Sequence, residues 1–346
     1  MNPNERPRTQ AQDDTVSSII INGFGRMGRL ALRHGFDRPG MNFIRINDPN
    51  MDADLAAHLL AFDSIHGRWH HAVDSDGDHL IIGKQRIAFS QAASLTELAR
   101  FASADIALEC SGRYRDAEAL GPWQQLSAHC VVSAPVKGGA PNVVVGVNDS
   151  DFDPSRDRVV SAASCTTNCL APVVKVVHEA FGIRHGAITT IHDATNTQRV
   201  IDSAHRDFRR ARATGENLIP TTTGSAKAIT VIFPELEGRL NGMAVRVPIL
   251  NASLTDAVFE LERAVSEEEV NAALKAAAEG ELNGVLGYED RPLVSSDYRG
   301  DTRSSIVDGL STMVVDGTQL KVVAWYDNET GYVCRMLDLV DRIRTS

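Results

Sequence analysis

The sequence predicts a mixed α/β fold in two domains, a largely parallel α/β sheet followed by an α+β domain with a largely antiparallel sheet. Three observations lead to this prediction. The 346 residues correspond to about two domains at roughly 150 residues each. In the first half, short apolar runs alternate with amphipathic, helix-compatible stretches, which is typical of parallel sheets. In the second half the apolar runs are longer and alternate with polar residues, which favours antiparallel strands.

Short apolar runs predict the strands of the first sheet. They occupy 18–21, 42–46, 105–109, 130–133 and 142–147. The start of the chain is different, because 1–18 is polar and contains Pro3 and Pro7. We expect 1–18 to be a disordered tail.

A second region begins near Ser161, and its longer runs predict a second sheet. These runs cover 187–192, 242–248, 255–260, 304–315 and 319–325. Between the first two of them lies the polar stretch 195–220, which contains Arg199, Arg206, Arg209, Arg210 and Arg212. On composition alone this stretch is a solvated surface loop as readily as a functional segment.

Composition excludes several classes of partner. The formal net charge is −10 and the sequence pI is near 5.6, so we expect neither nucleic acid nor an anionic membrane to be bound. No apolar run reaches the roughly 18 residues that span a bilayer, and the first residues lack the apolar core of a signal peptide. Five cysteines are too few for a disulfide framework. We therefore expect a cytoplasmic enzyme or binding protein.

The segment 23–28 reads Gly-Phe-Gly-Arg-Met-Gly and fits the pattern G-x-G-x-x-G between an apolar run and a helix-compatible stretch. Gly23 suits a tight turn, Gly25 a close backbone approach to a pyrophosphate, and Gly28 close helix packing. About 20 residues further on, Asp48 stands where an acid binds the adenosine ribose hydroxyls. The alternative is a set of turn glycines beside a capping Asp. The combination favours a Rossmann-type domain that binds NAD.

Cys165 is the candidate nucleophile, because the segment 164–169, Ser-Cys-Thr-Thr-Asn-Cys, opens a predicted helix. Free backbone N–H groups and the helix dipole stabilise a thiolate in a first turn. Cys169 lies one helical turn further on, so a metal pair or a disulfide must be weighed. No further Cys or His cluster completes a metal set, and we expect Cys169 to be a small buried residue and the chain to hold no metal.

His192 ends the apolar run 187–191. A lone histidine at the end of a strand is more often structural than catalytic. The chain has eleven histidines, and spacing does not select this one.

These residues resemble a known family, phosphorylating glyceraldehyde-3-phosphate dehydrogenase, from about Ile19 to Ile343. The resemblance rests on six segments of the sequence: 21–29, 164–168, 189–192, 221–227, 242–248 and 325–329. With the patterns above, it divides the chain into an NAD-binding domain at 19–164, a catalytic domain at 165–328 and a C-terminal helix at 329–346 that returns to the first domain.

The resemblance implies a role for each matched residue. Cys165 becomes the nucleophile and His192 its base. Arg26, Met27, Asp48, Ser133 and Asn328 are implied to contact NAD. The implied residues for glyceraldehyde 3-phosphate and inorganic phosphate are Ser164, Thr166, Thr195, Arg209, Thr223, Gly224 and Arg246. The family is usually a homotetramer in which the stretch 195–220 packs near the neighbouring subunit's cofactor, which overturns the surface-loop interpretation.

Two departures bear on the cofactor and on the physiological role. Ser203-Ala204 stands where NAD-preferring members commonly have Leu-Pro, which leaves use of NADP open, although a carboxylate at Asp48 repels a 2′-phosphate. The segments 58–69 and 111–114 are similar to the branch found with arsenate-resistance genes, which implies arsenate in place of phosphate.

Two alternative functions stay open at this point. One is erythrose-4-phosphate dehydrogenase, which hydrolyses the thioester, and Arg209 with Thr223-Gly224 favours phosphorolysis over it. The other is a non-catalytic NAD-binding regulatory protein, against which the retention of Cys165 and His192 counts.

Overall fold

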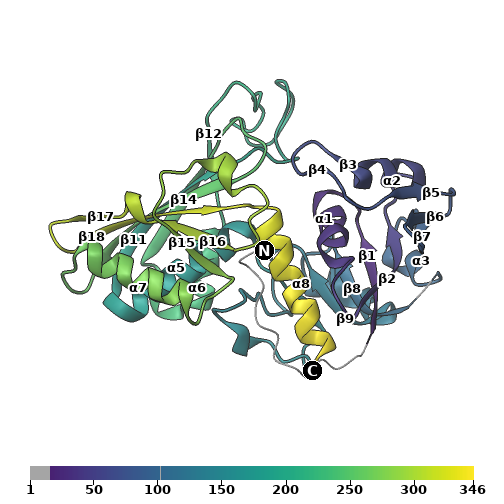
Figure 1. Cartoon of the computed structure of the whole chain (residues 1–346), viewed down its shortest axis with the longest axis horizontal. Helices are drawn as coiled ribbons and strands as arrows, with labels where there is room; N and C mark the ends of the chain where they lie inside the picture. Colours follow the sequence, from purple (N-terminus) through teal and green to yellow (C-terminus); the bar gives the residue numbers. More distant parts are fainter. Residues whose placement is uncertain (1–15, 102) are drawn as a thin grey trace.

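A computed structural model describes residues 16–101 and 103–346 and divides them into two lobes, each built on its own sheet (Figure 1). Most of the predicted tail lies outside the described residues. The first strand, β1 (Ser17–Asn22), begins two residues before Ile19. Ser17 and Ser18 pair with β2, and the Ser18 hydroxyl donates to Asp105 at 2.7 Å. The tail prediction is therefore wrong for these two residues, since their hydroxyls do not prevent strand pairing at a sheet end.

The first sheet has the order β10-β9-β8-β1-β2-β7-β6-β5. Six strands run parallel, and β5 and β6 add antiparallel pairing at one edge. The strands after β1 are β2 (Met41–Asn47), β5 (Val73–Ser75), β6 (His79–Ile82), β7 (Gln85–Ser90), β8 (Ala104–Glu109), β9 (Ser127–Val132) and β10 (Val159–Ser161). The connecting helices are α1 (Arg26–Gly35), α2 (Ala53–Ala61), α3 (Leu95–Leu98) and α4 (Ala117–Leu120), with a hairpin of β3 (Phe62–Asp63) and β4 (Gly67–Arg68) and the 3₁₀ turns η1 (Gly121–Gln125) and η2 (Asp149–Asp151).

The apolar run 142–147 is not a strand. Only Asn142 forms a bridge, with Ser161, and the chain then turns at Gly146, whose φ is 86°. The Asn148 side chain accepts the N–H of Val144 at 2.7 Å and so closes this turn. Val143 and Val144 are buried, and this is why the segment has a strand-like pattern.

The second sheet has the order β12-β13-β11-β14-β18-β16-β15, with β17 paired to β18. It is rich in antiparallel pairs, although β11 pairs with β13 and β15 with β16 in parallel. Its strands are β11 (Ile183–His192), β12 (Ile219–Thr222), β13 (Leu240–Arg246), β14 (Ser253–Leu261), β15 (Leu286–Glu289), β16 (Ser305–Asp308), β17 (Met313–Val315) and β18 (Gln319–Tyr326). The predicted strand 304–315 is thus two strands separated by η5 (Gly309–Ser311).

Three helices accompany the second sheet, and a fourth returns to the first. The former are α5 (Cys165–Phe181), α6 (Ser225–Ile232) and α7 (Glu267–Glu279), with 3₁₀ turns η3 (Pro234–Leu236) and η4 (Ser295–Tyr298). The last helix, α8 (Thr330–Arg344), packs against α1 between the lobes (Figure 1). Its Val333, Met336 and Leu337 belong to the same core as Ile19 and Ile21.

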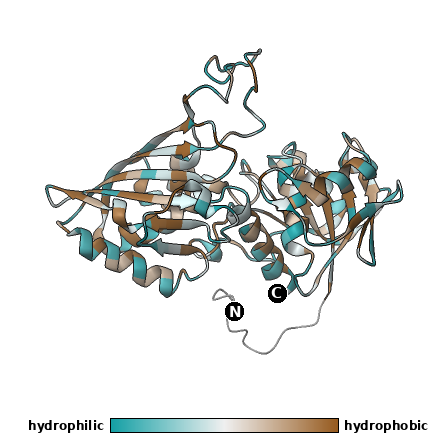
Figure 2. Cartoon of the chain, turned by 45° about the horizontal axis from the view of Figure 1, so that its top comes forward, coloured by the Kyte–Doolittle hydropathy of each residue, from teal (hydrophilic) through white to brown (hydrophobic). Residues whose placement is uncertain are grey.

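Hydropathy follows this arrangement. Hydrophobic residues recur along the strands of both sheets, whereas α7 is largely hydrophilic (Figure 2). Only Val270 and Leu274 of α7 are buried, so this helix covers the sheet with a narrow apolar stripe. Among the described helices, none is both long enough and apolar enough to cross a membrane.

Candidate active site

The glycine loop after β1 can be built only from glycine at two positions. Gly23 has a φ of 92°, and a Cβ there would lie 2.4 Å from the Ser111 nitrogen. A Cβ on Gly28 would lie 2.1 Å from the Gly23 carbonyl oxygen. Gly25, by contrast, faces open space and precedes the first turn of α1. The uncapped N–H groups at the start of α1 are therefore free to hold a phosphate.

A pocket opens beside this loop. Asn22, Gly23, Gly25, Asp48 and Ser111 contribute to its lining. Asp48 follows β2, and its two oxygens accept the N–H groups of Phe24 and Asn50, each at 2.9 Å. The carboxylate is thereby held at the pocket wall, where a ribose diol can donate to it. Loop, helix start and carboxylate together fit a dinucleotide.

The Arg26 side chain turns away from this pocket. Its guanidinium donates twice to Glu329, at 2.6 Å each, and also pairs with Asp63. Burial opposes the charge, but these two carboxylates raise the pKa of Arg26 above its ordinary value. A contact of Arg26 with NAD would thus come from its backbone at the helix start. Met27 beside it packs against the first core.

Ser133 directly follows β9 and lies at the same end of the sheet. Its N–H donates to the carbonyl of Glu109 at 2.9 Å, and the Ser133 side chain lies near Cys110, a residue of the pocket lining.

Cys165 is the first residue of α5. Ser164 caps this helix, because its hydroxyl accepts the N–H of Thr167 at 3.1 Å. Directly before it, Ala163 has a φ of 55°, a conformation unfavourable for a residue with a Cβ. This sharp turn between β10 and α5 presents the thiol at the helix N-terminus, where the dipole favours a thiolate.

His192 ends β11 and faces the thiol. Its Nε2 lies 3.7 Å from the Cys165 sulfur, although 27 residues separate the two in sequence. Its Nδ1 lies 2.6 Å from a carboxylate oxygen of Asp193. Burial works against a charged imidazole, but the contacts with Asp193 and Cys165 prevail and raise the pKa of His192 to about 9. An imidazolium therefore stands beside the sulfur at neutral pH.

Cys169 has none of these features. It is fully buried, and its thiol donates to the Ser305 hydroxyl at 3.6 Å. Burial raises its pKa to about 12, so it stays a neutral thiol. All five cysteines are free.

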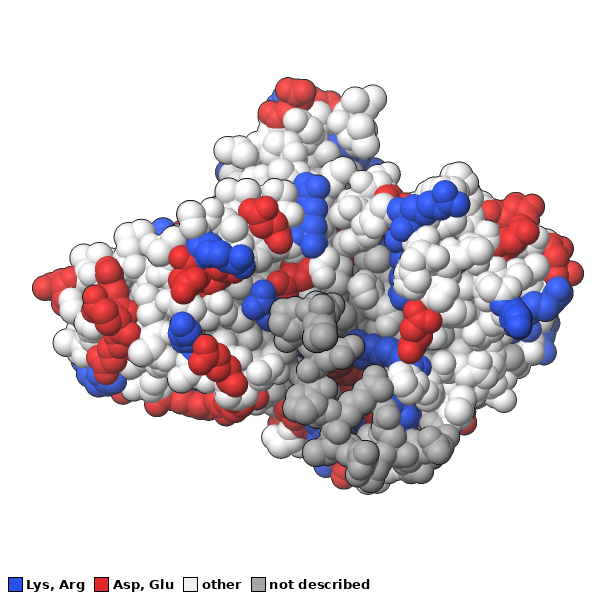
Figure 3. Space-filling model, viewed as in Figure 1, with Lys and Arg blue, Asp and Glu red and all other residues white. Residues whose placement is uncertain are grey.

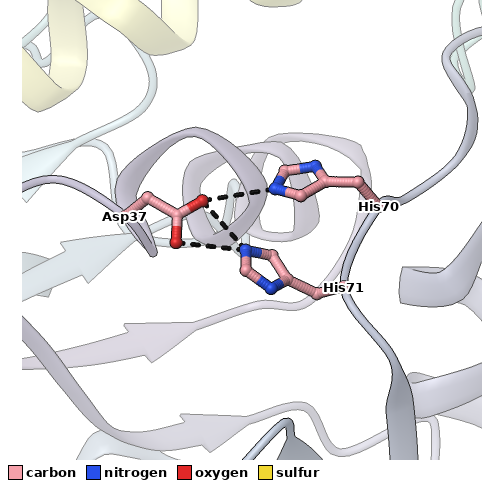
Figure 4. A group of neighbouring side chains, drawn as sticks. All are labelled: Asp37, His70 and His71. Atoms are coloured by element: carbon pink, nitrogen blue, oxygen red, sulfur yellow. Dashed lines mark hydrogen bonds and ion pairs between the residues drawn. The ribbon is translucent and has the colours of Figure 1, made fainter.

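One group in the described part of the chain has the geometry to hold a metal ion, Asp37 with His70 and His71 (Figure 4). The two imidazole Nε2 atoms point at the same carboxylate, at 3.3 and 2.9 Å. Asp37 and His70 are exposed on the surface of the first lobe. The sequence did not suggest this group because Asp37 lies more than 30 residues before the histidine pair.

Most of the predicted anion-binding residues already have hydrogen-bond partners. The Thr166 hydroxyl meets Tyr326 at 2.9 Å, and that of Thr195 meets Gln198 at 3.2 Å. The Thr223 hydroxyl donates to Ser225 at 3.1 Å, and Gly224 directly precedes α6. The Arg246 guanidinium donates to the Asp193 carbonyl at 2.9 Å and approaches His192.

Arg209 differs from these residues because its side chain is exposed. Its neighbour Arg210 is half-buried and donates to the Thr221 hydroxyl at 2.8 Å. Burial lowers the pKa of Arg246, and the positive charge of Arg210 acts in the same direction. Asp207 accepts the backbone N–H groups of both arginines, in a turn that sends the two side chains different ways. Arg210 therefore lies close enough to Arg246 to affect its charge, whereas Arg209, the expected anion-binding residue, is exposed.

Asn328 and Asp193 complete the site. The Asn328 amide donates to a carboxylate oxygen of Asp193 at 2.9 Å, and both residues are buried. No motif in the sequence marks Asp193 or Arg210, whose only signals are adjacency to His192 and to Arg209.

Comparisons with known proteins agree with this geometry. Residues 17–117 match the model of the glyceraldehyde 3-phosphate dehydrogenase NAD binding domain, and 164–328 match that of the C-terminal domain. The chain is 56% identical over 331 residues to glyceraldehyde-3-phosphate dehydrogenase 3 of Nostoc sp., covering 95% of this chain and 98% of the relative. It is 50% identical over 323 residues to the enzyme of Geobacillus stearothermophilus, covering 93% and 96%. It is 41% identical over 327 residues to enzyme 1 of Saccharomyces cerevisiae, covering 94% and 98%.

Proposed function

Because the chain belongs to the glyceraldehyde-3-phosphate dehydrogenase family and is an NAD-dependent oxidoreductase, we propose that it oxidises glyceraldehyde 3-phosphate with inorganic phosphate to 1,3-bisphosphoglycerate. The observation that carries the proposal is the Cys165 sulfur at the start of α5, 3.7 Å from the Nε2 of a buried His192. A non-catalytic regulatory protein would not need this pair. The fit of the glycine loop and Asp48 to a dinucleotide supports the cofactor.

In the proposed mechanism, the Cys165 thiolate forms a bond to the aldehyde carbon. The carbonyl oxygen becomes an oxyanion, to which His192 Nε2–H and the Cys165 backbone N–H donate. The oxyanion then takes the proton of His192 Nε2. His192, now neutral, takes the hydroxyl proton back as the carbon gives up hydride. NAD supplies the hydride acceptor when bound. The resulting thioester is cleaved by phosphate, and Cys165 leaves as the thiolate.

Two anions must be held for this reaction, the phosphate of the substrate and the attacking phosphate. We assign Arg246 and Arg210 to the charge of these pockets, since a guanidinium presents paired donors to a phosphate. Ser164, Thr166, Thr195, Thr223 and Gly224 supply hydroxyl and backbone donors. We assign Arg210 rather than Arg209 because Arg210 acts on the charge of Arg246, whereas the Arg209 side chain is exposed.

The test is a spectrophotometric assay of NAD reduction. With glyceraldehyde 3-phosphate, turnover should require an oxyanion that cleaves the thioester. Phosphate and arsenate should both serve, because they are near-isosteric and such a pocket discriminates poorly between them. Oxidation that proceeds equally without either anion, and faster with erythrose 4-phosphate, would instead identify a hydrolytic erythrose-4-phosphate dehydrogenase.

We also propose a homotetramer in the cytoplasm. Within 195–220, which projects from the second lobe (Figure 1), Val200, Ile201 and Phe208 are 83%, 74% and 87% exposed. Large apolar side chains exposed to this degree are typical of a subunit interface. Light scattering after gel filtration should give four times the 37.5 kDa chain mass, and a lower mass for Phe208→Glu.

Acidic and basic groups are mixed on the face shown in Figure 3, a pattern unlike a nucleic-acid-binding surface.

The arsenate role is a separate proposal, supported by the resemblance of 58–69 and 111–114. If it holds, deletion of the gene sensitises the host to arsenate and leaves growth on sugars nearly intact. Loss of sugar growth with unchanged arsenate tolerance would return the protein to central metabolism.

A further inference from the structure

We propose that Asp193 is a positioning residue for His192: its carboxylate accepts the Nδ1 proton and thereby holds Nε2 toward the Cys165 sulfur. This inference rests on the proposed function, in which His192 is the acid and base. It adds a third member to the pair, in the order Cys165, His192, Asp193. The contact is short, 2.6 Å from His192 Nδ1 to Asp193 Oδ1.

The carboxylate is built into the site from several sides. Asp193 is only 1% exposed, so an unpartnered charge there would be costly. Asn328 donates to its Oδ2 at 2.9 Å, and the Ser253 hydroxyl approaches its Oδ1 at 3.3 Å. The Asp193 N–H donates to the same Ser253 oxygen at 3.1 Å. These bonds fix the carboxylate in the orientation that faces the imidazole.

Asp193 also decides a competition at Nδ1. The Arg246 NH1 group lies 2.7 Å from this atom, and an arginine can only donate. A neutral His192 that accepted from Arg246 at Nδ1 would carry its proton on Nε2 and could not act as a base toward the substrate. The carboxylate favours the opposite tautomer, with the proton on Nδ1 and a free Nε2 lone pair.

The Asp193 carbonyl oxygen also lies 3.0 Å from Nδ1, but it already accepts from Arg246 at 2.9 Å and carries no charge. The other side chains facing His192 do not replace the carboxylate. Cys165 on α5 meets Nε2, and Arg246 on β13 carries the wrong charge to hold the Nδ1 proton. Tyr326 on β18 presents its ring, with centroids 6.2 Å apart and at 84°, and its hydroxyl is bonded to Thr166. Among the charged groups around His192, Asp193 is therefore the acceptor.

Asp193→Asn tests the proposal with little change in shape. Asn328 can only donate toward this side chain through its amide N–H, so the new amide turns its oxygen to Asn328 and its NH₂ to His192 Nδ1. This selects the unproductive tautomer. We expect kcat to fall about 10- to 100-fold with KM changed little, less than the loss in His192→Asn, because Asp193 acts through His192. Asp193→Glu, which restores the acceptor, should recover part of the rate.

The discriminating measurement is the pH profile of Cys165 alkylation by iodoacetamide in two backgrounds. Asp193→Asn should move the profile to higher pH when His192 is present and leave it unmoved in His192→Asn, since coupled residues are non-additive. Ser253→Ala, which keeps the His192 contact, serves as the matched control and should move the profile less. Equal effects in both backgrounds, or none in either, would overturn the inference. Absence of glyceraldehyde 3-phosphate oxidation in the unmodified enzyme would instead refute the proposed function.

Discussion

The two lobes build their parts of the site in different ways. In the first lobe, the cofactor pocket is made mostly of backbone: two glycines without room for a Cβ, the start of α1, and one carboxylate. In the second lobe, the reacting groups are side chains from separate elements, with Cys165 on α5, His192 on β11 and Arg246 on β13.

Because of this difference, we expect glycine substitutions in the first lobe to affect cofactor binding and side-chain substitutions in the second lobe to affect the chemical step. A pocket made of backbone changes when a glycine is replaced, and it is indifferent to most neighbouring side chains. A site made of convergent side chains loses its chemistry when one atom is replaced, while the fold survives. Substitutions in the second lobe should therefore separate chemistry from cofactor binding.

Cys165→Ser is expected to have the largest effect. It should abolish dehydrogenase activity, because the sulfur forms the bond to the substrate, and should leave NAD binding within a few fold. Steady-state rates and an NAD titration followed by fluorescence provide the two measurements.

Cys169→Ser is the matched control in the same helix. Its thiol is buried against Ser305, so most activity should remain. Equal losses in the two variants would show that the nucleophile is wrongly assigned or that the cysteines act as a pair.

His192→Asn should lower kcat by about 10²- to 10⁴-fold, the usual worth of a positioned acid and base. It should also slow alkylation of Cys165 near neutral pH, because the pKa of His192 of about 9 keeps an imidazolium beside the sulfur there. In the unmodified enzyme this partner is lost only as the pH rises through about 9. An unchanged alkylation profile would mean that the two side chains are not in contact.

The two adjacent arginines give a smaller and more local test. Arg210→Ala should raise KM for glyceraldehyde 3-phosphate or phosphate by about tenfold or more, the loss of one charge-assisted contact. Arg209→Ala should change either constant less than twofold, because its side chain is exposed. The reverse result would restore Arg209 to the anion site.

The smallest expected effect concerns the first lobe, where Asp48 influences the preference for NAD over NADP. NADP should be used measurably, with NAD preferred by about tenfold or more, since the Asp48 carboxylate repels a 2′-phosphate. Ser203-Ala204 lies on the projecting stretch 195–220, so any relaxation it brings depends on a neighbouring subunit. Comparing kcat/KM for the two cofactors decides this. Strict NAD dependence would show that Asp48 alone determines the choice.

The sequence was informative where function depends on local pattern. The glycine loop, Asp48 and the helix start at Cys165 follow from neighbouring residues, and both predicted sheets are present. Long-range pairing was beyond such reasoning, because only β11 brings His192 to Cys165. Here the family resemblance supplied the partner. It named Arg209 for the anion site, and the choice between Arg209 and Arg210 depends on side-chain directions at the Asp207 turn that neither composition nor spacing reveals.

The return of α8 to the first lobe has a consequence for protein synthesis. Val333, Met336 and Leu337 complete the core that contains Ile19 and Ile21, so the N-terminal domain lacks part of its interior until α8 has been translated. Domains usually fold in the order of synthesis. In this chain the earlier of the two domains is completed last, and a product that lacks α8 exposes the apolar side chains that this helix covers.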